Sequence, residues 1–188
     1  MALRLTLPTL LTLFRIALLP IMVAVFYLPF RGANIAASAI FMAAALTDWL
    51  DGWIARRYGM TSAFGAFLDP VADKLMVATT LFLLVQDNPT VPLAIISTVI
   101  VGREITISAL REWMAAIGER ARVRVATIGK VKTIVQMVAL VVLLYQKDLD
   151  GFGLFHVGEV LLAIAAVLTI WSGLVYVRAA LPVLRGQA

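Results

Sequence analysis

Residues 48–73 read DWLDGWIARRYGMTSAFGAFLDPVAD and contain four aspartates, Asp48, Asp51, Asp69 and Asp73. The first two are three positions apart and the last two are four apart, so each pair projects from one face of a helix. A short connection makes the two helices antiparallel neighbours, and the pairs can then face each other. Four carboxylates this close would repel one another without a cation, and hard oxygen ligands favour Mg²⁺. The stretch therefore predicts two helices whose aspartates share divalent metal ions.

The rest of the chain has the composition of a membrane protein, in which a buried carboxylate marks a functional site. Of its 188 residues 62% are hydrophobic, and the mean hydropathy is +0.98. This is too apolar for an ordinary soluble domain, and the lack of cysteine excludes disulfides and thiolate metal sites. We expect an all-α integral membrane protein, a single domain over residues 1–188. It should form a six-transmembrane-helix bundle from segments 10–28, 35–56, 67–86, 91–117, 127–145 and 157–179.

The basic residues predict how this bundle is oriented, because positive charge concentrates in cytoplasmic loops. With a cytoplasmic N-terminus, the opposite face keeps only Arg31 and Lys147. The cytoplasmic face then collects Arg4, Arg15, Arg56, Arg57, Arg120, Arg122, Arg124, Lys130, Lys132, Arg178 and Arg185. Both termini and the aspartates should therefore face the cytoplasm. The residues before Leu10 read as a short N-terminal interfacial helix or as an extended lead-in.

Small residues accompany the aspartates. Gly52 and Ala55 fall on the stripe of the first pair, and Gly65 comes one turn before Asp69. Small side chains at these positions would let a bulky ligand approach the helix backbone closely. Two metals bridged by carboxylates are suited to displacement at phosphorus. The alternative is a set of ion pairs inside the membrane, with Arg56, Lys74 and Arg103 as the partners.

The same stretch resembles a known family. It matches every fixed position of the Asp-x2-Asp-Gly-x2-Ala-Arg-x8-Gly-x3-Asp-x3-Asp motif of the CDP-alcohol phosphatidyltransferases. Residues 103–113 and 129–137 are similar to the bacterial branch that forms phosphatidylglycerophosphate. The resemblance implies transfer of a phosphatidyl group from CDP-diacylglycerol to sn-glycerol 3-phosphate, with release of CMP. It also implies a homodimer in the bacterial inner membrane, with its active site at the cytoplasmic surface.

The resemblance also implies roles for individual residues. Asp48, Asp51 and Asp69 would bind the metals, two Mg²⁺ ions or else Mn²⁺. Asp73 would share the metal site and act as the base that takes a proton from the attacking hydroxyl. The pocket for CDP-diacylglycerol would be shaped by four further motif residues, Gly52, Ala55, Arg56 and Gly65, with Arg56 on the diphosphate.

An acceptor that carries a phosphate requires a second cationic pocket. The candidates are Arg103 and Arg111, about two turns apart on one helix face, together with Lys130 and Lys132. Arginine binds phosphate with a planar fork and lysine as a point charge, so the mixture suits a small doubly charged ligand. Alternatively, the two lysines could reflect only the excess of positive charge at the cytoplasmic face. Arg103 could instead form an ion pair with Glu104 or Asp73.

Other functions remain open on the residues alone. The same chemistry could use inositol phosphate, serine, choline or a second phosphatidylglycerol as the acceptor, although an uncharged or zwitterionic acceptor would not require the basic cluster. An intramembrane prenyltransferase also uses aspartate pairs and Mg²⁺, but on well-separated helices. A metal-ion transporter would need acidic residues along a path across the membrane or inverted repeats, and the sequence contains neither.

Overall fold

The computed structural model describes residues 6–60, 62–118, 127–145 and 153–184, without the side chains of 127–130 and 184. All regular structure in these ranges is helical, which confirms the predicted all-α class. The six helices are α1 (Leu7–Tyr27), α2 (Ala33–Tyr58), α3 (Ala63–Asp87), α4 (Val91–Ala116), α5 (Thr127–Tyr145) and α6 (Leu154–Leu184). Each corresponds to one predicted segment, with boundaries that differ by a few residues.

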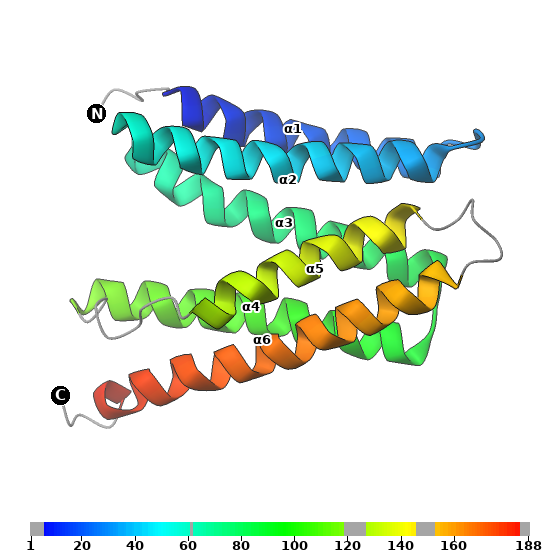
Figure 1. Ribbon diagram of the computed structural model, residues 1–188. Coiled ribbons are helices and arrows are strands. Elements are labelled where there is room, and N and C mark those ends of the chain that lie inside the picture. The colour runs from blue at the N-terminus through cyan, green and yellow to red at the C-terminus, as the bar shows by residue number, and fades with distance from the viewer. Residues whose placement is uncertain (1–5, 61, 119–126, 146–152, 185–188) are drawn as a thin grey trace.

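The connection between α2 and α3 fixes the geometry of the aspartates. Gly59 ends α2 with a φ of 65°, a left-handed conformation that glycine adopts without steric cost. Ser62 then caps α3, its hydroxyl accepting a hydrogen bond from the Gly65 N–H at 2.9 Å. The chain reverses within these few residues, so α2 and α3 run antiparallel, as the sequence predicts (Figure 1).

The helices form a bundle in which distant parts of the sequence lie together. Helix α1 packs along α2 and α3, α6 packs along α4 and α5, and α2 also contacts α5. Every helix contributes a fully buried side chain to one core: Met22, Phe41, Leu81, Leu93, Leu140 and Leu162. The start of α1, the α2–α3 connection and the end of α6 lie at the same end of the bundle (Figure 1).

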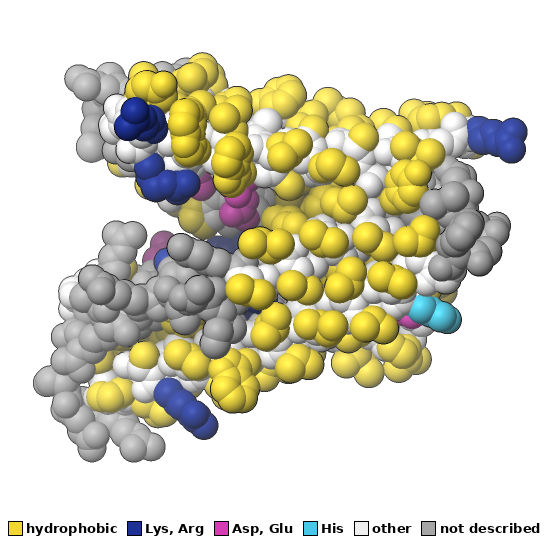
Figure 2. All heavy atoms as spheres, in the orientation of Figure 1, with side chains coloured by type: hydrophobic (Ala, Val, Ile, Leu, Met, Phe, Trp, Pro, Cys, Tyr) yellow, Lys and Arg dark blue, Asp and Glu magenta, His cyan; other side chains and the backbone are white. Residues whose placement is uncertain are grey.

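Four of the helices, α1, α2, α4 and α6, are long and apolar enough to cross a membrane. Hydrophobic side chains cover much of the outer surface in Figure 2, as a surface in contact with lipid requires. Within the described residues, α5 contains a shorter apolar stretch, and α3, which carries Asp69, Asp73 and Lys74, is not among the four. The chain is therefore a multi-pass membrane protein, and the count of six spans stays a prediction.

The segment before Leu10 differs in part from its prediction. Leu7, Pro8 and Thr9 form the first turn of α1, with proline at the helix start where its missing N–H costs nothing. Within the described residues no separate interfacial helix precedes the first span. Residues 1–5 lie outside the described part of the chain.

Candidate active site

A buried arginine on α1 gathers three of the four aspartates. The Arg15 side chain is only 1% exposed. Its Nη1 lies 2.6 Å from Asp48 Oδ1 and 2.8 Å from Asp73 Oδ1, and its Nη2 binds Asp51 Oδ2. The two aspartate pairs therefore converge, as their helical spacing predicts. In the described part of the chain, the alternative partners Arg56, Lys74 and Arg103 form no ion pair with these four aspartates.

The fourth aspartate is also held by α1. The hydroxyl of Thr12, one turn before Arg15, donates a hydrogen bond to Asp69 Oδ1 at 2.5 Å. Thr12 and Arg15 are both fully buried, so α1 acts as the support of the whole acidic cluster. The sequence offers one signal for this role, a charged residue with a threonine three positions earlier in an otherwise apolar span.

The aspartates differ in their access to solvent. The Asp51 side chain is 4% exposed, whereas those of Asp48 and Asp73 are 39% and 45% exposed. Asp51 is therefore the anchor of the ion-pair network, since a buried carboxylate requires a bound partner. Asp48 and Asp73 keep oxygen atoms open to a ligand.

The chemistry of this cluster fits a hard divalent cation. Its side-chain oxygens belong to carboxylates, which Mg²⁺ and Mn²⁺ prefer as ligands. Arg15 shows that positive charge is required where these oxygens meet, because its guanidinium contacts three of the four. In the described part of the chain, however, no group of three or more acidic side chains is close enough to enclose an ion.

The small residues of the motif have different surroundings. A Cβ on Gly65 would lie 2.9 Å from Thr9 Oγ1 and 3.0 Å from Ser62 Oγ, so Gly65 permits the close packing of α3 on α1. A Cβ on Gly52 would instead meet the end of the Arg56 side chain at 3.2 Å. Arg56 is exposed and Ala55 is half-buried at the same helix end.

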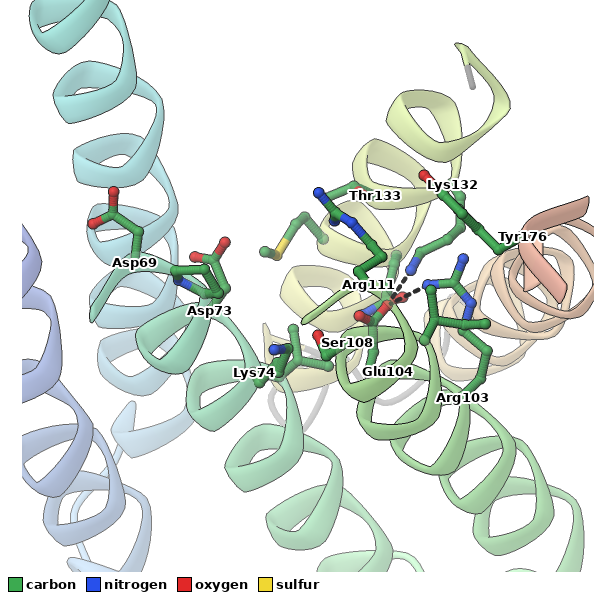
Figure 3. A pocket seen from close by; sticks show the side chains of 15 residues that line it. Asp69, Asp73, Lys74, Arg103, Glu104, Ser108, Arg111, Lys132, Thr133 and Tyr176 are labelled. Carbon is green, nitrogen blue, oxygen red and sulfur yellow. Dashed lines mark hydrogen bonds and ion pairs between the residues drawn. The ribbon is translucent and has the colours of Figure 1, made fainter. Parts of the chain in front are cut away.

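A cavity of about 330 Å³ opens beside Asp69 and Asp73. Its other walls come from α4, α5 and α6, so the cavity lies between α3 and these three helices. Figure 2 shows a hollow with acidic and basic side chains at the end of the molecule where α1 begins. The charged side chains that line the cavity are Asp69, Asp73, Lys74, Arg103, Glu104, Arg111 and Lys132 (Figure 3).

The basic residues of this cavity form a second organised cluster. Arg103 donates from Nε to the Thr169 carbonyl at 3.1 Å and from Nη2 to Ser172 Oγ at 2.7 Å, so α6 fixes its position. Its Nη1 lies 3.3 Å from Glu104 Oε1, which also binds Lys132 Nζ. Figure 3 shows this group facing Asp69 and Asp73 across the cavity.

The structure thus brings three of the four predicted acceptor-binding residues, Arg103, Arg111 and Lys132, into one cavity with two of the aspartates. The side chain of Lys130 lies outside the described residues. From the sequence, Glu104 is expected only as a partner of Arg103. In the structure this carboxylate also binds Lys132, twenty-eight positions later on α5.

Comparison with known proteins agrees with this geometry. Residues 5–171 match the family described as CDP-alcohol phosphatidyltransferase. The chain belongs to this family. Proteins named CDP-diacylglycerol–glycerol-3-phosphate 3-phosphatidyltransferase are similar to it over nearly their whole length. The protein of Pectobacterium atrosepticum is 52% identical over 92% of this chain and 93% of its own. The protein of Sodalis glossinidius is 50% identical over 94% of this chain and 96% of its own.

Membership of the CDP-alcohol phosphatidyltransferases accounts for the motif from Asp48 to Asp73, which lies wholly within the matched residues. The match also includes α1 and residues 103–137, so the two clusters that face the cavity both belong to the family domain. The cavity is therefore the place at which this family's chemistry should be sought in this chain.

Proposed function

We propose that this phosphatidyltransferase transfers the phosphatidyl group of CDP-diacylglycerol to sn-glycerol 3-phosphate, giving phosphatidylglycerophosphate and CMP. One observation carries the proposal: a single cavity has Asp69 and Asp73 on one wall and Arg103, Arg111 and Lys132 on another. The acidic wall suits a metal-bound diphosphate, and the basic wall suits an acceptor with its own phosphate. The name shared by the relatives supports glycerol 3-phosphate as that acceptor.

Asp48, Asp51, Asp69 and Asp73, of which the last two line the cavity, would hold the divalent ions, two Mg²⁺ or else Mn²⁺. When bound, such ions would neutralise the diphosphate of CDP-diacylglycerol and the charge on the departing CMP. Arg56 would bind the diphosphate at the rim, where it is exposed. Gly52, Ala55 and Gly65 would shape the same pocket, Gly65 indirectly, because it sets the distance between α1 and α3.

Asp73 is the best placed base. It lines the cavity, and its side chain is the most exposed of those bound to Arg15. Its carboxylate would accept the proton of the C1 hydroxyl as that oxygen bonds to the β-phosphorus. The bond from this phosphorus to the CMP oxygen breaks in the same displacement. Positioning of the two substrates supplies much of the rate in such reactions.

On the basic wall, Arg103, Arg111 and Lys132 would bind the acceptor phosphate, with Lys130 as a further contributor. Arg103 is held by the Thr169 carbonyl and by Ser172, so it presents its charge without a large loss of side-chain freedom. The cluster favours a phosphorylated acceptor over serine or choline, because neither of these carries a phosphate for the basic wall to bind.

The protein would lie in the bacterial inner membrane with both termini and the cavity at the cytoplasmic side. The position of Arg56, Arg57, Arg111 and Arg178 toward the cavity's end of their helices supports this orientation. It would place the cavity where a water-soluble acceptor and a lipid substrate can both reach it. A homodimer is a further prediction from the family, and cross-linking in membranes would test it.

The test is release of CMP by the purified protein from CDP-diacylglycerol, with glycerol 3-phosphate, inositol phosphate and serine offered in parallel. We expect release with glycerol 3-phosphate, its loss after chelation of divalent ions, and its recovery with Mg²⁺. Release with serine alone would overturn the proposed acceptor. Full activity in excess chelator would overturn the metal site.

A further inference from the structure

A glutamine on α5 is buried at the cavity, and its amide oxygen has no partner among the described residues. Gln136 lies one turn after Lys132, on the same face of the helix, and it is 3% exposed. It lines the cavity together with Asp73 and Lys132. Its Oε1 atom is buried and has no hydrogen-bond partner in the described part of the chain.

Such an atom is costly, because a buried amide that loses water without gaining a hydrogen bond destabilises the fold. Four buried side-chain atoms of the described residues share this condition: Arg15 Nε, Ser97 Oγ, Gln136 Oε1 and Thr169 Oγ1. Of these four residues, only Gln136 lines the cavity between the aspartates and the basic cluster. The missing partner of Gln136 is therefore to be sought in a ligand of this cavity.

The chemistry of the acceptor identifies that partner. In glycerol 3-phosphate the phosphate would meet the basic cluster and the C1 hydroxyl would meet Asp73, which leaves the C2 hydroxyl between them. A hydroxyl both donates and accepts a hydrogen bond, so it can pair with either end of a glutamine amide. Gln136 is about 6 Å along the helix from Lys132, so both side chains can reach one small acceptor.

We propose that Gln136 binds the non-reacting C2 hydroxyl of the acceptor and so selects for an acceptor that carries it. This inference rests on the proposed function and deepens it, because it assigns a specificity residue that the aspartate motif does not include. A site built to hydrogen-bond a substrate hydroxyl discriminates against the analogue that lacks it, since the buried amide is then left unpaired.

The experiment compares two acceptors that differ by this one hydroxyl. 3-Hydroxypropyl phosphate has the phosphate and the primary hydroxyl of glycerol 3-phosphate but no C2 hydroxyl. We expect the wild-type protein to prefer glycerol 3-phosphate in kcat/KM by about 10- to 100-fold. In Gln136→Leu this preference should fall to near unity, through loss of activity with glycerol 3-phosphate alone.

Two controls separate binding from folding. Ser97→Ala removes another buried atom without a recorded partner, away from the cavity, and should keep the wild-type preference. Gln136→Leu should not lower the melting temperature, because the amide oxygen has no recorded hydrogen bond to lose. If leucine prevents folding, Gln136→Met offers an unbranched side chain without an amide for the same comparison.

The outcomes are distinct. An unchanged preference in an active Gln136→Leu or Gln136→Met protein would overturn the assignment of Gln136 and leave the proposed function intact. Equal use of the two acceptors by the wild-type protein would also overturn it. A wild-type protein that releases no CMP with glycerol 3-phosphate, but does so with another acceptor, would instead overturn the proposed function.

Discussion

The acidic and basic walls of the cavity are built on the same plan with opposite signs. On the acidic side a buried cation, Arg15, binds three carboxylates from two other helices, and one of them, Asp73, lines the cavity. On the basic wall a single carboxylate, Glu104, binds Arg103 and Lys132. Each cluster of like charges is thus held together by one residue of the opposite sign. The difference is burial: Arg15 is 1% exposed, whereas Glu104 is 24% exposed.

This difference predicts that the acidic wall is the more important for stability and the basic wall for affinity. Removing one member of a buried ion pair leaves an uncompensated charge away from water, which is strongly destabilising. Removing Glu104 should cost less: Arg103 and Lys132 are themselves largely buried, but both line the open cavity, and hydrogen bonds to α6 still hold Arg103. Substitutions on the two walls should therefore have different effects.

The largest effect is expected on the acidic wall, at the reacting centre. Asp73→Asn should lower the rate of CMP release by about 10²- to 10⁴-fold, because an amide cannot accept the proton of the attacking hydroxyl. Binding of CDP-diacylglycerol should remain close to that of the wild type, since the amide keeps the shape of the side chain. Turnover and lipid binding are measured separately. CMP release at the wild-type rate would refute the role of Asp73 as the base.

The second effect is on stability. Arg15→Met should lower the free energy of unfolding by about 3–5 kcal/mol, chiefly because Asp51 is left buried without its partner. Added Mg²⁺ should raise the melting temperature of this variant more than that of the wild type, since the ion restores positive charge among the aspartates. Arg15→Lys, which keeps the charge but not the fork, is the matched control. A variant as stable as the wild type, with no response to Mg²⁺, would contradict this account.

The sequence predicts the arrangement of the four aspartates better than it predicts Arg15, the residue that holds three of them together. The spacing of Asp48, Asp51, Asp69 and Asp73 and the glycine turn between them determine two antiparallel helices with facing carboxylates, and the structure has this arrangement. These features are local and follow from helical periodicity. Helical periodicity does not predict which residue binds the aspartates, because that depends on which helix packs against α2 and α3. Arg15 is far from Asp51 and Asp73 along the chain and is brought to them only by tertiary packing.

The same limit applies to the basic wall. Arg103, Arg111 and Lys132 are predicted as a phosphate pocket because they are cations in an apolar context, and the structure places all three at the cavity. The roles of Glu104 and Gln136 could not be predicted in this way. Each depends on contacts between α4, α5 and α6 that no periodic pattern specifies. A glutamine in a helix also resembles any other polar residue until its burial and its lack of a partner are seen.

The third prediction tests the basic wall as an affinity site. Lys132→Gln should raise the KM for glycerol 3-phosphate by about 10- to 100-fold, because one charge-assisted hydrogen bond to the phosphate is lost. The KM for CDP-diacylglycerol should change far less. Lys130→Gln belongs in the same series, and Arg178→Gln, an exposed cation that does not line the cavity, is the control. Equal effects on both substrates would argue against an acceptor-phosphate pocket.

The smallest effect is expected at Glu104. Whether its substitution lowers or raises the KM for glycerol 3-phosphate decides how far the two walls differ. Glu104→Gln keeps an oxygen that can accept from Arg103 and Lys132 but removes the negative charge that competes with a phosphate for them. The KM for glycerol 3-phosphate should therefore fall by a few-fold, while the free energy of unfolding falls by about 1–2 kcal/mol as the two cations lose their common partner. Kinetics and thermal unfolding of the same preparation measure both. If the KM instead rises as it does in Lys132→Gln, Glu104 positions the cations for the phosphate, and the two walls are alike in needing their central charge for binding.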